Sequence, residues 1–226
     1  MILSHPQNAK AVKMKNNSSF EIIAAPFRLL FPGFCLPASI LCLLSAGCSL
    51  PEAKPDAARY YVLPTPAEAA PAKAPALRLG LLPVHLPEYL RSPSLAVRQG
   101  ASEVRYNDDA RWAEPLEAGL ARVLRAKLAA SAQVVAYPFR LDESRDVDVR
   151  VQILACEGTA DGGVNFAATF EIFAPGSGSG TQHAFTAEPA KWDGRDYARL
   201  AELLGADAAQ LADAIASALP AKTGSP

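Results

Sequence analysis

Two stretches of strict alternation near the middle of the chain constrain the fold most. Between Asp146 and Ile153 every second residue is apolar. The same period of two returns after the dipeptide Asp161-Gly162, in Val164, Phe166, Ala168, Phe170 and Ile172. A period of two places these side chains on one face of a β-strand, and an Asp-Gly dipeptide is typical of a tight turn. The pattern predicts a long antiparallel hairpin with one buried face.

Shorter apolar stretches predict further strands on both sides of this hairpin. Leu77–His85 is almost continuously apolar, which is typical of a strand covered on both faces. Arg59–Leu63 interrupts a Pro-rich region with aromatic and β-branched residues, which favours an edge strand docked on the domain. Turn residues separate the remaining short strands, which we expect at 94–98, 103–106, 133–139 and 181–185.

Two amphipathic stretches predict helices. We expect the first to begin after Asn107-Asp108-Asp109, which offers caps, with Pro115 in its first turn. Its apolar stripe is Leu116, Leu120, Val123, Leu124 and Leu128. The second should begin near Asp193 or Asp196 and bury Tyr197, Leu200, Leu204, Ala208, Leu211, Ile215 and Leu219. The predicted fold class is therefore α/β: a mixed β-sheet with a long antiparallel hairpin, covered by at least two helices.

The N-terminal region has the features of an export signal. Four basic residues precede an uncharged apolar run from Leu29 to Ser45, and small residues follow it. The run contains two prolines and is shorter than the roughly 20 residues of a membrane-spanning helix. Translation could begin at Met1 or at Met14.

The junction Ala46-Gly47-Cys48 resembles the lipobox of bacterial lipoproteins, although Ser45 replaces the usual Leu or Val. We expect Cys48 to carry the lipid, and the alternative is a plain secretory signal that ends near a cysteine. The resemblance implies an outer-membrane location, because Ser49, not Asp, follows the cysteine. The predicted parts are a signal peptide (1–47), a lipidated Pro/Ala-rich tether (48–76) and a domain (77–226) with 59–63 as a docked strand.

Composition narrows the possible functions. The net charge of −1 gives no electrostatic basis for nucleic-acid binding. Only Cys156 remains in the predicted domain, so we expect no disulfide within it and a buried thiol. His85 and His183 lie far apart and no zinc-ligand spacing occurs. We therefore expect no metal site and no cofactor.

No catalytic arrangement is apparent, and we expect the chain not to be an enzyme. The loop 176–180 superficially resembles a nucleophile elbow, but Gly178 stands where the nucleophile would be, and the loop joins two strands. The acidic cluster Asp142–Asp146 is more typical of a solvated loop, and His183 alternates with Phe185 as a strand residue would.

Two corners of the chain are candidates for docking a partner protein. Each places an aromatic residue beside a carboxylate, one in Pro87–Leu90 and one in Arg111–Leu116. The candidate docking residues are Tyr89, Leu90, Trp112 and Glu114. In the alternative interpretation, Trp112 and Tyr89 fill the core where the strands meet the helix, and Glu114 caps that helix.

The order of these motifs resembles the PqiC-like (YmbA-like) auxiliary lipoproteins of ABC-type transport systems. The shared features are the lipobox, Tyr60-Tyr61 with Leu63, the stretch Leu82–Leu90, Val97-Arg98, the run Arg111–Leu116, two hairpin strands and a closing helix. Arg91-Ser92 departs from the Asp-Arg pair that the family often has there.

The resemblance implies a lipoprotein that is anchored in the outer membrane by its acyl chains and faces the periplasm. It would dock an MCE-domain protein of the inner membrane in an ABC-type lipid transport system that supports envelope integrity, as a ring-like homo-oligomer. Two alternatives remain open. One is an accessory lipoprotein of outer-membrane assembly or lipopolysaccharide export, and the other is a surface hydrolase.

Overall fold

A computed structural model describes residues 56–66 and 77–220 of the chain, which belong to one compact unit from Pro55 to Pro226. The predicted signal peptide, Cys48 and most of the tether lie outside the described residues. The strands are β1 (Arg59–Tyr61), β2 (Leu77–Leu81), β3 (Ser94–Arg98), β4 (Val104–Trp112), β5 (Ala132–Ala136), β6 (Val147–Thr159), β7 (Gly163–Phe173), β8 (Thr181–Thr186) and β9 (Ala190–Lys191). The helices are the 3-10 turn η1 (Glu88–Arg91), α2 (Leu116–Leu128) and α3 (Tyr197–Ala218).

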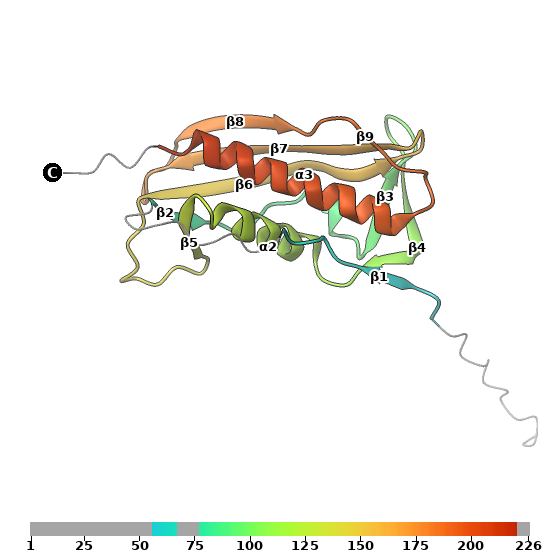
Figure 1. The fold of residues 1–226 in the computed structure, drawn as a ribbon, viewed down its shortest axis with the longest axis horizontal. Coiled ribbons are helices and arrows are strands. Elements are labelled where there is room, and N and C mark those ends of the chain that lie inside the picture. Colours follow the sequence, from blue (N-terminus) through green and yellow to red (C-terminus); the bar gives the residue numbers. More distant parts are fainter. Residues whose placement is uncertain (1–55, 67–76, 221–226) are drawn as a thin grey trace, which may run out of the picture. The chain divides into compact units, whose positions relative to one another are not determined.

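The nine strands form one mixed sheet, and β6 is its central strand (Figure 1). The order is β1-β4-β3-β6-β2-β5, with β7 also pairing β6, and β8 and β9 pairing β7. Strands β6 and β7 form the predicted long antiparallel hairpin, with Val149 opposite Ile172 and Gly158 opposite Val164. At its turn Gly162 has a φ of 80°, a conformation that favours glycine. The prediction of the hairpin is confirmed.

Two strands share the second edge of β6. Because β7 occupies the first edge, β2 and β3 both pair in parallel with the other, β2 at Val149 and β3 at Gly158. The predicted strand 77–85 is therefore too long: β2 ends at Leu81, and only an isolated bridge joins His85 to β6. Pro83 has no N–H to donate to a ladder, and the chain then leaves the sheet through η1.

The end of β4 differs from the sequence prediction. Asn107-Asp108-Asp109 do not cap a helix, because β4 continues through them to Trp112. Parallel pairing with β1 accounts for the last residues of β4, with Arg59 opposite Ala110 and Tyr61 opposite Trp112. Pro115 occupies the N-cap position of α2 and supplies no side-chain cap. The predicted edge strand 59–63 is confirmed as β1, although it is shorter.

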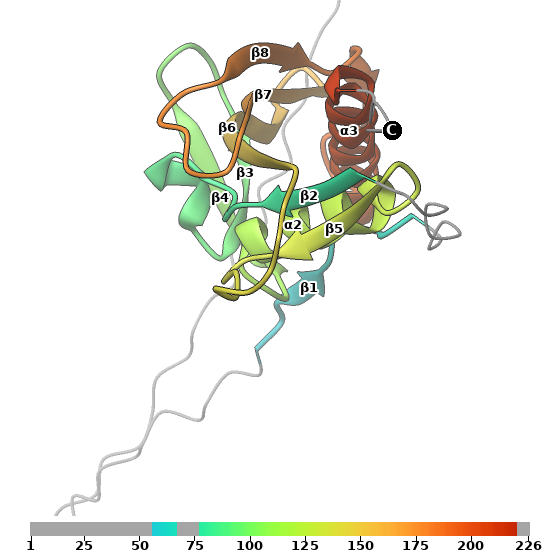
Figure 2. The ribbon, with the colours of Figure 1, turned by 90° about the vertical axis from the view of Figure 1, so that its left-hand side faces the viewer.

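Both helices cover the sheet and pack against each other (Figures 1 and 2). The predicted stripe of α2 is buried, as is that of α3 from Leu200 to Ile215. Asp196, one of the two predicted caps, accepts hydrogen bonds from the N–H groups of Ala198 and Arg199. Cys156 is 2% exposed, so the prediction of a buried thiol is confirmed. No helix within the described ranges is long and apolar enough to cross a membrane.

Candidate docking surface

The segment that follows the first predicted corner meets the second corner in space. The backbone N–H of Trp112 donates to the carbonyl of Pro93 (2.7 Å), and that of Ala113 donates to the carbonyl of Tyr61 (2.8 Å). These bonds join three separate segments at the point where α2 begins. Two of these segments line a hollow of about 380 Å³, whose residues are Arg91, Ser92, Pro93, Trp112, Ala113, Glu114, Pro115, Leu116 and Glu117. We call this set of residues the docking surface.

The floor of the docking surface is apolar and buried. Trp112 is 8% exposed and Leu116 is 4% exposed, so most of the Trp112 ring belongs to the core. Leu90 is 3% exposed and contributes to the core alone. These burials agree with the alternative interpretation of Trp112, in which a large aromatic fills the junction. A role in docking stays a prediction for both residues.

Glu114 forms an ion pair and does not cap α2. Its carboxylate accepts a hydrogen bond from Arg122, and the same guanidinium donates to the carbonyl of Leu63 at 3.0 Å. Gly119 makes room for this carboxylate, because a Cβ there would lie 3.2 Å from its Oε1 atom. The ion pair therefore ties the first turns of α2 to the segment after β1, at the rim of the hollow.

Tyr89 faces away from the docking surface. Its ring lies over the guanidinium of Arg98, 5.6 Å from the centroid, and its carbonyl accepts a hydrogen bond from the Tyr106 hydroxyl at 2.8 Å. Burial, together with the negative charge of Glu157, raises the pKa of Tyr89 to about 12. Its phenol is therefore protonated at physiological pH and fastens η1 to the sheet.

Sequence reasoning missed the buried ion pair beneath Tyr89. Glu157 is fully buried, pairs with Arg98 and accepts a further hydrogen bond from the Asn165 amide at 3.3 Å. It follows the bulge between Ile153 and Ala155, where the alternation of β6 is interrupted. The available signal was weak: Arg98 ends β3, and Glu157 lies within β6 two residues before that strand ends.

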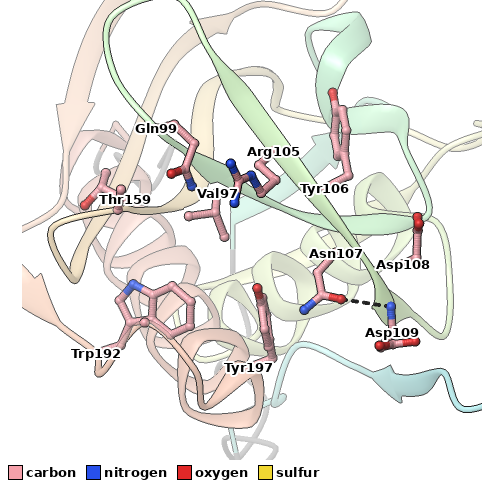
Figure 3. Close-up of a pocket in the computed structure, with 12 residues that line it drawn as sticks. Val97, Gln99, Arg105, Tyr106, Asn107, Asp108, Asp109, Thr159, Trp192 and Tyr197 are labelled. Carbon is pink, nitrogen blue, oxygen red and sulfur yellow. Dashed lines mark hydrogen bonds between the residues drawn. The ribbon is translucent and has the colours of Figure 1, made fainter. Parts of the chain in front are cut away.

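A second hollow is larger and lies between β4 and the start of α3. It has a volume of about 570 Å³ and is lined by Val97, Gln99, Arg105, Tyr106, Asn107, Asp108, Asp109, Thr159, Ala160, Trp192, Gly194 and Tyr197 (Figure 3). We call it the β4–α3 cleft. The sequence analysis assigned Asn107, Asp108 and Asp109 to a helix cap and therefore missed it.

The remaining sequence candidates are structural. In the loop 176–180, the Ser177 hydroxyl donates to the carbonyl of Ser179 at 2.7 Å. His183 lies on β8 and stacks on Phe170, with 4.8 Å between the ring centroids. Within 56–66 and 77–220, no group of three or more His, Cys, Asp or Glu side chains could hold a metal ion. Cys48 lies outside the described residues, so its lipidation stays a prediction.

The sequence matches the family model of ABC-type transport auxiliary lipoprotein components over residues 61–216. No curated protein matches the chain. Two solved structures are similar in fold. An uncharacterized protein has a TM-score of 0.59 and 20% identity, covering 71% of this chain and 97% of its own. Protein XCC0632 from Xanthomonas campestris has a TM-score of 0.54 and 18% identity, covering 70% and 93%. At these identities the likeness establishes the fold alone.

Proposed function

Because the chain belongs to the family of ABC-type transport auxiliary lipoprotein components, we propose that it docks the transport partner of that system in the periplasm. The partner we propose is an MCE-domain protein of the inner membrane, and the cargo is lipid. In this proposal the lipoprotein performs no chemistry. It holds its partner near the outer membrane and so supports envelope integrity.

The lipobox supports the proposed location. Cys48 would carry acyl chains, each buried methylene contributing about 0.8 kcal/mol to membrane attachment. Ser49 follows that cysteine, as expected of an outer-membrane lipoprotein, and a Pro-rich segment separates the anchor from the domain. A semi-extended tether of this composition would hold the domain away from the membrane surface.

The hollow formed by two chain segments at the docking surface carries the proposal for partner binding. The hollow has a buried aromatic floor at Trp112 and a charged rim at Arg91, Glu114 and Glu117. Interfaces often concentrate their binding energy in such a pocket, with a polar rim that excludes water. Backbone hydrogen bonds already hold its walls, which lowers the ordering cost of binding.

A free sheet edge supports a homo-oligomer. Among the described strands β8 pairs with β7 alone, and it carries no Lys, Arg, Asp or Glu. Proteins commonly use charged side chains to prevent the pairing of exposed edges, and β8 has none of these. We propose that edge contacts of this kind contribute to a ring of copies, since a repeated head-to-tail contact forms a ring when its rotation closes.

The test is co-purification with the tagged lipoprotein, followed by mass spectrometry of the captured proteins. We expect Glu114→Arg to reduce partner recovery at least tenfold, because it places a second positive charge beside Arg122 and reverses the charge at this point of the rim. Glu202→Arg is the matched control, since Glu202 forms an exposed ion pair with Arg199 outside the docking surface. Equal recovery by both variants, with unchanged melting temperatures, would place the docking site elsewhere.

The identity of the captured proteins tests the biological role separately. An MCE-domain protein is the expected partner. Recovery of outer-membrane assembly or lipopolysaccharide-export proteins in its place would replace this proposal with the alternative drawn from the sequence. Trp112→Ala needs a melting curve beside each binding measurement, because the loss of a core Trp costs about 3–5 kcal/mol.

A further inference from the structure

Three strands of the sheet have one edge that no other described strand covers. β1 pairs only with β4, β5 only with β2, and β8 only with β7. Outside these ladders, no backbone hydrogen bond joins β5 or β8 to another described segment. The uncovered edge of a strand presents unpaired N–H and C=O groups, and these form a template for a further strand.

The three edges differ in how they are protected against pairing. β1 has only three residues and begins with Arg59, and a short, charged strand is a common protection. β5 has five residues and β8 has six, and neither contains a Lys, Arg, Asp, Glu or Pro. Neither strand has a bulge in its ladder. Of the described edges, those of β5 and β8 are therefore open to pairing.

β5 and β8 lie at opposite ends of one row of strands and point in the same direction. The row is β8-β7-β6-β2-β5 (Figure 2). β5 and β2 are parallel to β6, whereas β7 is antiparallel to β6 and β8 is antiparallel to β7. β8 is therefore parallel to β5. A second copy, rotated about an axis roughly along the strands, keeps this direction, so its β5 would meet β8 as a parallel strand.

The ladders also define the offset between the two edges. Val149 of β6 lies at the same level as Ala136, the last residue of β5, and Thr181, the first residue of β8. The start of β5 is therefore about four residues, or roughly 13 Å, behind the start of β8. Across five strands at ~4.8 Å each, a tilt of roughly 30° between the strands and the axis compensates this offset. Strands of closed barrels have a similar tilt of about 35–45°.

With the starts of the two strands aligned, Gln133 of one copy lies opposite Gln182 of the next. Both side chains are exposed, and the ladders place both on the same face of the sheet as Arg150, whereas Val149 and Val151 on the other face are buried. An offset of one residue would exchange the two faces, but an offset of four keeps them matched. The two edges are therefore complementary in direction, length and face.

We propose that copies of this chain join by parallel pairing of β8 of one copy with β5 of the next, which extends the sheet from copy to copy. The proposal rests on the homo-oligomer proposed above and assigns the edge that receives β8. Because β5 and β8 are different surfaces, the contact is head-to-tail. It uses both unprotected edges of every copy, whereas a symmetric contact between two β8 strands would leave β5 open in both copies.

The test is disulfide formation between copies of the full chain in detergent, after light scattering has given the mass of the unaltered protein. The double variant Gln133→Cys with Gln182→Cys should form a ladder of linked copies on mild oxidation. Directly opposite residues have the Cα separation of about 4.4–6.8 Å that a disulfide needs. Each single variant should stay unlinked, because the contact joins two different edges. Cys156 is buried, and the unaltered chain reports any linkage through Cys48.

The control and the possible outcomes separate this pairing from other contacts. Gln152→Cys is the matched control, since Gln152 is exposed on the central strand β6, and it should stay unlinked. Linked dimers of Gln182→Cys alone would overturn the proposal in favour of a symmetric contact. An oligomer whose double variant does not link would overturn this pairing and leave the proposed homo-oligomer standing. A monomeric unaltered protein would overturn both.

Charge variants test the same contact without a covalent bond. Gln133→Lys with Gln182→Lys should raise the dissociation constant of the contact by up to about fivefold, because like charges directly opposite each other destabilise strand pairing. Gln133→Glu with Gln182→Lys should restore the association, since the two charges then attract. Equal dissociation constants for the two double variants would show that these edges do not pair.

Discussion

Asp207 is a buried carboxylate, and its replacement by Asn should make the stability of the domain less dependent on pH. Its side chain lies on α3, is 3% exposed and has no hydrogen-bond or ion-pair partner among the described residues. Burial raises the pKa of Asp207 from 3.8 to about 6. One unit of pKa corresponds to about 1.4 kcal/mol, so the shift is on the order of 3 kcal/mol.

The sign of this pH effect follows from the protonation of Asp207 in the folded and the unfolded chain. Below pH 4 the carboxyl is protonated in both folded and unfolded chains, and it imposes no penalty. Between pH 4 and 6 the unfolded chain ionises while the folded chain does not, so the free energy of unfolding falls. Above pH 6 both states are ionised and the penalty is constant. Asp207→Asn removes this titration and should raise stability at pH 7.5 relative to pH 4 by up to about 3 kcal/mol.

The assay is urea unfolding of the unlipidated chain from Ala57 onward at pH 4 and pH 7.5. We expect this chain to unfold cooperatively, because the described core lies within it. Asp213→Asn is the control: Asp213 lies on the same helix but is exposed, and it pairs with Lys127 at 3.3 Å. Such surface pairs contribute about 0–1 kcal/mol. A difference between Asp207→Asn and the unaltered chain that is the same at both pH values would refute the reasoning.

Three further predictions concern other residues. Cys48→Ser should abolish acyl labelling and leave uncleaved precursor; labelling that persists would disprove lipidation at Cys48. Cys156 should react slowly with thiol reagents until the chain is unfolded, because burial and the nearby charge of Asp207 raise the pKa of its thiol; rapid labelling of the native protein would show that it is accessible. Gly205→Ala should lower the free energy of unfolding by about 1 kcal/mol. The added methyl group would crowd Pro64 at a cost of about 1–3 kcal/mol, which outweighs the higher helix propensity of Ala. A higher melting temperature would contradict this.

The Gly205 prediction illustrates a limit of sequence reasoning. In sequence terms the glycine interrupts a helix stripe at a cost of about 1 kcal/mol relative to Ala. In the structure a Cβ at this position would lie 2.7 Å from the Cδ atom of Pro64. The glycine therefore permits the segment after β1 to pack on α3. No local pattern carries that contact, because the two residues are far apart in the sequence.

Periodicity identified the elements that bury one face, but it could not identify buried charges. The β6–β7 hairpin and the stripes of both helices follow from spacing alone, since burial selects apolar side chains at a fixed period. Asp207 lies seven residues after Leu200 and four before Leu211, both on the buried stripe, so its spacing did indicate burial. The charge of its carboxylate argued against burial, because unpaired carboxylates are seldom buried. Glu157 was missed because a bulge changes the alternation before it.

The docking surface depends on the topology of the sheet, which explains why the sequence singled out Trp112 and Glu114 but not the arrangement around them. Because β2 and β3 pair with the same edge of β6, the chain must leave the sheet after Leu81 and re-enter it at Ser94. That excursion forms η1 and delivers Pro93 to the backbone N–H of Trp112. The parallel strand β1 brings the carbonyl of Tyr61 to the same corner. A one-dimensional motif can mark each segment as unusual, but only the shared edge of β6 and the pairing of β1 with β4 together bring all three to one place.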